Sequence, residues 1–169
     1  MATFFNNNLY PPIMPDVLPA FTSDICQIPF GFSIYNSSSD VAAIQMSVIN
    51  QRTNASALDT ELYPLGIKFI FGGGDALSET SSEYNYAVFL ESNDLKTKSF
   101  ETNEFYKIQL RFVSTGASIP PSSSTEISAK WITENQAFFS EWSTVCLIRK
   151  ITEPQLILNG FDKNDDEDT

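Results

Sequence analysis

Two stretches of apolar residues, Phe105–Val113 and Phe139–Arg149, constrain the fold more than any other part of the chain. The apolar residues of the first stretch alternate with polar ones and are Tyr106, Ile108, Leu110 and Phe112. Successive side chains of a strand point to opposite faces, so this pattern predicts a strand with one buried face. The second stretch is rich in branched and aromatic residues, which favour strands. Because Gly116, Pro120, Pro121 and a serine run lie between them, we expect an antiparallel pair with a long connection.

The rest of the chain repeats this rhythm of short strands and turns. Further extended segments are predicted at Cys26–Tyr35, Val41–Asn50, Ile67–Phe71, Tyr84–Leu90 and Ile127–Ile132. About seven or eight short strands with frequent turns are typical of an antiparallel sandwich. We therefore predict an all-β fold, a single β-sandwich domain at residues 24–152 with a long insertion at 114–138.

The two ends differ in composition from this domain. Four prolines predict an extended N-terminal arm at residues 1–23, and they are Pro11, Pro12, Pro15 and Pro19. The apolar side chains of the arm include Phe4, Phe5, Leu9, Tyr10 and Ile13. Two alternatives follow: the arm folds back onto its own domain, or it binds a neighbouring subunit through these five residues. Residues 153–169 combine an extra apolar run with an acidic tail that we expect to be disordered.

The charge balance excludes two classes of partner. The net charge of −11 is repelled by phosphate backbones and anionic lipids, so we expect no nucleic acid and no membrane partner. No apolar run approaches the ~20 residues of a spanning helix. The N-terminus lacks the pattern of a signal peptide, so we expect synthesis in a cytoplasm. In such a reducing compartment Cys26 and Cys146 are expected to be free, buried thiols, with a disulfide as the alternative.

The residues needed for catalysis or metal binding are largely missing. The chain has no histidine, which removes the usual catalytic triads and the commonest metal ligand. Two cysteines without histidine cannot make an ordinary zinc site. The run Gly72–Gly74 lacks the Lys-Ser/Thr of a phosphate-binding loop and predicts a turn.

Two acidic sets remain to be weighed. Glu134 and Glu141 flank Trp131 and Trp142 and could form the carboxylate pair of a glycosidase, but solvated surface carboxylates explain them better. Asp162, Asn164 and Asp166 have the spacing of calcium ligands, yet Glu167 stands where such a loop needs glycine. We therefore expect no catalytic residue, no cofactor and no metal.

The two alternating stretches resemble the end of a fibronectin type III-like, immunoglobulin-like sandwich. The sixth strand of that family begins with tyrosine followed by alternating apolar residues, as at Tyr106–Phe112 here. A glycine and a Ser-Trp-Ser-like run often precede its last strand, as do Gly116 and Ser140–Ser143 here. The connection of this chain is longer than the hairpin of the family. The resemblance implies a sandwich over about a third of the chain.

The chain as a whole resembles virion proteins of tailed bacteriophages, especially the crAss-like group. The resemblance lies in the Asn- and Phe-rich start, the Ser140–Ile148 stretch and the Pro154–Phe161 run. It implies a non-enzymatic structural component of a neck, tail ring or fibre, located in the virion. The partners implied are further copies of the chain and other virion proteins. The alternative is a carbohydrate- or surface-binding adhesin module that uses Trp131 and Trp142.

Overall fold

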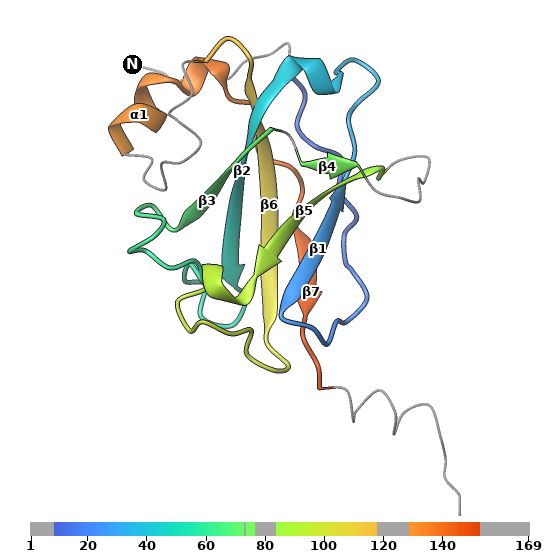
Figure 1. Ribbon diagram of the computed structural model, residues 1–169, viewed down its shortest axis with the longest axis vertical. Coiled ribbons are helices and arrows are strands. Elements are labelled where there is room, and N and C mark those ends of the chain that lie inside the picture. Colours follow the sequence, from blue (N-terminus) through green and yellow to red (C-terminus); the bar gives the residue numbers. More distant parts are fainter. Residues whose placement is uncertain (1–8, 73, 77–83, 118–128, 153–169) are drawn as a thin grey trace, which may run out of the picture.

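The structure is a computed structural model that describes residues 9–72, 74–76, 84–117 and 129–152. The strands are β1 (Ile25–Phe30), β2 (Val41–Asn50), β3 (Ile67–Phe71), β4 (Asp75–Ala76), β5 (Tyr86–Glu91), β6 (Phe105–Ser114) and β7 (Cys146–Arg149). They form two sheets of antiparallel strands, ordered β3-β2-β6-β7 and β1-β5-β4 (Figure 1). The short helices are α1 (Ala129–Glu134), η1 (Ser38–Asp40), η2 (Ser92–Asp94) and η3 (Gln136–Phe138). The prediction of a mostly antiparallel, all-β protein is confirmed.

The main hydrophobic core lies between the two sheets. The alternation in β6 places Tyr106, Ile108, Leu110 and Phe112 in this core. The opposite sheet contributes Ile28, Phe30, Val88 and Leu90. Full burial of such a side chain is worth about 1.5–3 kcal/mol, so these two rows hold the sheets together.

The antiparallel pair expected between the two key stretches is present, but its second strand is shorter than predicted. Only β7 pairs with β6 as a strand, from Phe105 opposite Arg149 to Ile108 opposite Cys146. Upstream of β7 two serine side chains bind the backbone of β6. Ser140 Oγ accepts from the N–H of Phe112 at 2.9 Å, and Ser143 Oγ accepts from the N–H of Leu110 at 3.0 Å. The serine hydroxyls replace backbone carbonyls as acceptors, while the N–H groups of Ser140 and Ser143 still donate to Phe112 O and Leu110 O. The pairing therefore continues upstream of β7 without the regular ladder of a strand.

The prediction of an extended segment at Ile127–Ile132 is wrong for its described part. Residues Ala129–Glu134 form helix α1, while Ile127 lies outside the described residues. Trp131 and the neighbouring Ile132 both pack on the same apolar cluster. Adjacent strand residues point to opposite faces, whereas adjacent helix residues can share one, so the helix satisfies both side chains.

The strand predicted at Cys26–Tyr35 ends earlier, at Phe30. Beyond it, Gly31 exchanges two backbone hydrogen bonds of 2.9 Å with Ile13. Phe32 then turns inward and its ring stacks on that of Phe112, with centroids 4.9 Å apart. The next residues form a loop that leads to β2.

The described part of the N-terminal arm, residues 9–23, packs onto its own domain. Leu9 is only 5% exposed and belongs to the main core, as does Met14. Further along, Leu18 N–H donates to Leu147 O at 3.0 Å and Phe21 N–H donates to Arg149 O at 3.1 Å. The arm therefore runs from the end of β1 to the free edge of β7 and covers both.

We predict that Ser143→Ala lowers the free energy of unfolding by about 1–3 kcal/mol, because the buried N–H of Leu110 loses its acceptor. Urea denaturation measures the effect. Thr144→Ala is the matched control, since Thr144 is exposed and adjacent. Equal stability of the two variants would contradict the role given to the serine.

Candidate interaction surface

The carboxylates considered for catalysis or metal binding are exposed or lie outside the described residues. No group of three or more His, Cys, Asp or Glu side chains among them could hold a metal ion. Glu134 and Glu141, the candidate carboxylate pair, are both exposed, and Glu134 lies 3.9 Å from Lys130 on the same helix. The calcium-like set at Asp162, Asn164 and Asp166 lies outside the described residues.

Both cysteines are buried and free. Burial raises the pKa of Cys26 to about 12, with the nearby Cys146 adding to the shift. Burial likewise raises the pKa of Cys146 to about 11. The thiolate is the reactive form, so neither side chain is a nucleophile at neutral pH.

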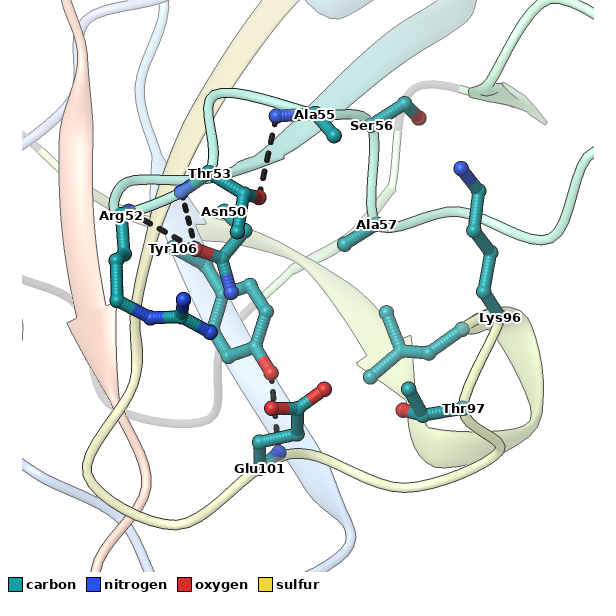
Figure 2. A pocket seen from close by; sticks show the side chains of 11 residues that line it. Asn50, Arg52, Thr53, Ala55, Ser56, Ala57, Lys96, Thr97, Glu101 and Tyr106 are labelled. Atoms are coloured by element: carbon teal, nitrogen blue, oxygen red, sulfur yellow. Dashed lines mark hydrogen bonds between the residues drawn. The ribbon is translucent and has the colours of Figure 1, made fainter.

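A small hollow lies at the end of the molecule where β2 stops. Figure 2 shows Asn50, Arg52, Thr53 and Lys96 around it, with Glu101 and Tyr106 on one side. Its volume is about 190 Å³, below the ~300 Å³ at which ligand pockets begin.

Several polar groups of this hollow are hydrogen-bonded within the chain itself. Asn50 Oδ1 accepts from the N–H groups of Arg52 and Thr53 at 2.9 and 3.1 Å. The Tyr106 hydroxyl accepts from Glu101 N–H at 3.0 Å. These bonds stabilise a turn and a loop corner, so the hollow has a structural role.

A buried carboxylate links the two sheets at the side where β3 and β5 meet. Asp94 accepts from Lys68 Nζ at 2.6 Å and from the Tyr63 hydroxyl at 2.9 Å. It also accepts from Glu91 N–H at 3.0 Å. Burial and the hydrogen bond to Asp94 raise the pKa of Tyr63. Every observed contact of this carboxylate serves the fold.

A second apolar cluster covers the outer face of the four-stranded sheet, and Trp131, one of the two tryptophans that were candidates for surface binding, packs on it. Trp131 packs edge-to-face on Phe69, with ring centroids 5.6 Å apart, and is half-buried. Trp142 is half-buried over the Arg111 guanidinium, 4.6 Å from its ring centroid. Both rings are engaged within the chain.

Arg111 itself was predicted to face solvent but is only 5% exposed. Its guanidinium lies between Trp142 and Phe139, 4.3 Å from the centroid of the latter ring, and its Nε donates to Gln45 Oε1. Burial lowers its pKa to about 10, so it remains charged at neutral pH. One residue of the sequence is related to this burial. Gln45 is a polar residue in the middle of β2, and it lies directly opposite Arg111 of β6.

The most exposed large apolar side chains lie on the loop after β1. We call Phe32–Asn36 the apical loop. Within it Ile34 is 90% exposed and Tyr35 is 71% exposed. The Tyr10 ring lies 5.1 Å from that of Tyr35 and is itself partly exposed. The two tyrosines thus form an exposed pair of rings, and Ile34 precedes Tyr35 in the same loop.

The apical loop is held in place by hydrogen bonds. Asn36 Nδ2 donates to Tyr10 O at 2.9 Å, and Asn36 Oδ1 accepts from Tyr10 N–H at 3.4 Å. Asn36 N–H also donates to Ser33 O at 3.0 Å, which closes a turn. The side chains of Ile34 and Tyr35 are thus presented to solvent from an anchored backbone.

The five arm residues predicted to bind a partner have different locations. Leu9 is buried in the core, so it is not available to a partner. Tyr10 and Ile13 are each about 40% exposed near the apical loop. Phe4 and Phe5 lie outside the described residues.

We predict that neither thiol of the native protein reacts with a thiol reagent such as DTNB at pH 8, because both are buried and protonated. After unfolding in guanidinium chloride without reductant, both should react. Rapid reaction of the native protein would contradict the burial, and silent thiols after unfolding would indicate a disulfide.

None of the helices within the described ranges has the length and apolar character required to cross a membrane. A scan against protein-family models finds no match to the chain, and a search of the curated proteins finds none either.

Proposed function

We propose that the protein is a non-enzymatic structural component of a phage particle, a sandwich module that binds neighbouring subunits through exposed apolar surfaces. The observation that carries the proposal is the apical loop, where an anchored backbone presents Ile34 and Tyr35 to solvent. Contiguous exposed apolar side chains mark interaction sites more often than scattered ones do. The setting in a virion comes from the resemblance of the sequence to virion proteins of tailed bacteriophages.

The arrangement of the strands supports a fibronectin type III-like or immunoglobulin-like sandwich. β1 and β5 pair in one sheet, while β2, β6 and β7 lie together in the other with β3 added beside β2. Immunoglobulin-like sandwiches place their B and E strands and their C, F and G strands in this way. The bond from Glu101 N–H to the Tyr106 hydroxyl, at the start of β6, matches their tyrosine corner.

The composition of the apical loop favours a protein partner. Ile34 and Tyr35 lie in a stretch without charged residues from Gln27 to Ser39, although the chain carries a net charge of −11. Burying a side chain of this size contributes about 1.5–3 kcal/mol. Phe4 and Phe5, a few residues before Tyr10, remain part of the proposed contact surface.

Mass spectrometry and immunogold labelling of purified particles of the phage that encodes this chain test the proposal. We expect several copies per particle, at a regular position, because symmetric assemblies repeat each subunit. Absence of the protein from purified particles would sink the proposal. Binding to glycans that Trp142→Ala abolishes would instead favour the adhesin alternative.

We predict that the double variant Ile34→Ser, Tyr35→Ser folds normally but is incorporated into particles at least about tenfold less, since two apolar contacts are lost. The matched control is Leu62→Ser, Leu65→Ser, which removes two exposed apolar side chains from the loop between β2 and β3. Equal incorporation of both double variants would contradict the role of the apical loop.

A further inference from the structure

The two sides of the molecule differ in how their strand edges are covered. On one side the N-terminal arm hydrogen-bonds to Leu147 and Arg149 and so covers the edge of β7, and it also pairs with Gly31 just beyond β1. On the opposite side, β3 is the last strand of its sheet (Figure 1). No strand among the described residues pairs with the outer edge of β3.

The register identifies which backbone groups of β3 are unpaired. Gly72 N–H donates to Ala42 O at 3.0 Å, and Phe71 lies opposite Ala43. Hydrogen-bonded and non-hydrogen-bonded pairs alternate along an antiparallel ladder. The N–H and C=O groups of Phe69 and Phe71 therefore point away from β2, toward the open side.

The neighbouring edge of β5 is already occupied by the chain itself. Phe89 O accepts from Lys68 Nζ at 3.2 Å, and Glu91 N–H donates to Asp94 at 3.0 Å. A strand added on this side would consequently pair with β3, whose backbone groups have no such side-chain partners among the described contacts.

A groove with apolar and charged walls runs beside this free edge. It has a volume of about 330 Å³, and its lining includes Ile70 and Phe71 of β3, Val88 and Phe89 of β5, and the charged Lys68 and Glu91. Phe89 is 39% exposed. Because Phe69 lies on the outer face of β3 and Ile70 on the inner face, an added strand would meet apolar side chains on both of its faces.

A segment with this character follows β7 in the sequence. Residues 155–161 contain the consecutive apolar residues Leu156, Ile157 and Leu158. Since successive strand residues alternate, Leu156 and Leu158 would share one face and Ile157 would lie on the other. Such a strand has apolar side chains on both faces, which can pack on Phe69 on one face and on Ile70 on the other.

The chain's own segment is too short to reach this position. A strand added beside β3 lies four strand spacings from β7, about 19 Å at the usual spacing. Ile151 N–H donates to Phe21 O of the arm at 2.9 Å, so the chain at residue 151 still follows the direction of β7. Leu156 is four residues beyond Thr152, and four extended residues span at most about 14 Å. The strand must therefore come from another copy.

We propose that residues 155–161 of one copy pair with the outer edge of β3 in a second copy, extending its four-stranded sheet. The inference rests on the proposed function, because it names one contact by which the subunits assemble. Each copy has one donor segment and one acceptor edge, so the contact is head-to-tail and can build a ring or a filament.

Complementation between two blocked full-length variants tests this inference by analytical ultracentrifugation. Leu156→Asp, Leu158→Asp blocks the donor. Phe71→Pro blocks the acceptor, because it removes an N–H that faces away from β2 together with the Phe71 ring that lines the groove. We expect wild-type protein to self-associate, and each variant alone to be monomeric with a dissociation constant raised about tenfold or more. An equimolar mixture should form a complex of two chains, since each supplies what the other lacks.

Matched controls separate this pairing from other effects. Asn164→Asp, Thr169→Asp adds the same charge outside residues 155–161 and should associate like wild type. Phe89→Asp places a charge in the groove without changing the backbone of β3, so it blocks the acceptor even if Phe71→Pro unfolds.

Three outcomes would overturn the inference: monomeric wild-type protein, a donor variant that still associates, or a mixture that fails to combine. Association of the donor variant that is lost in Phe71→Pro would mean that two β3 edges pair directly. If the donor variant enters particles as wild type does, the proposed function stands and this contact fails. If the wild-type protein is absent from particles, the proposed function itself fails.

Discussion

The pairing of β6 with β2 is the interaction on which the rest of the structure depends. The two longest strands run antiparallel from Asn50 opposite Tyr106 to Val41 opposite Ser114, with one irregularity near Ala43. Their inner faces supply one wall of the core, and their outer faces carry the cluster around Arg111. β3 and β7 are added at either side, so the position of every exposed edge follows from this central ladder.

The arm and the free edge of β3 both concern the unpaired backbone groups of edge strands. Unpaired strand edges invite association, and proteins cover them or use them. Here residues 9–23, which include four prolines without a backbone N–H, cover one side of the molecule. The side with β3 has no such cover among the described residues. Leu9 thereby packs within its own chain, and the contacts that we propose with neighbouring subunits lie at the apical loop and the β3 edge.

Strand positions could be predicted from the sequence wherever apolar and polar residues alternate or an apolar run lies between turns. Val41–Asn50 and Ile67–Phe71 were predicted with the bounds that the structure has. Alternation could not reveal the burial of Arg111, because the aromatic rings that cover it come from residues 139–142, outside any regular strand. It also could not place the arm, because its few backbone bonds depend on edges that exist only after the sheets have formed. The exposed apolar residues of the apical loop look like a continuing strand in sequence, so the candidate surface was missed.

Residue-resolved hydrogen exchange at β3 tests the central claim most directly, because it compares amides that face β2 with amides that face outward. In dilute protein, the amides of Lys68 and Ile70 should exchange slowly and those of Phe69 and Phe71 quickly. On assembly, the amides of Phe69 and Phe71 should become protected by at least about tenfold as a new strand pairs with them. Assembly that leaves their exchange unchanged would contradict the account, since the free edge would then have no part in joining the subunits.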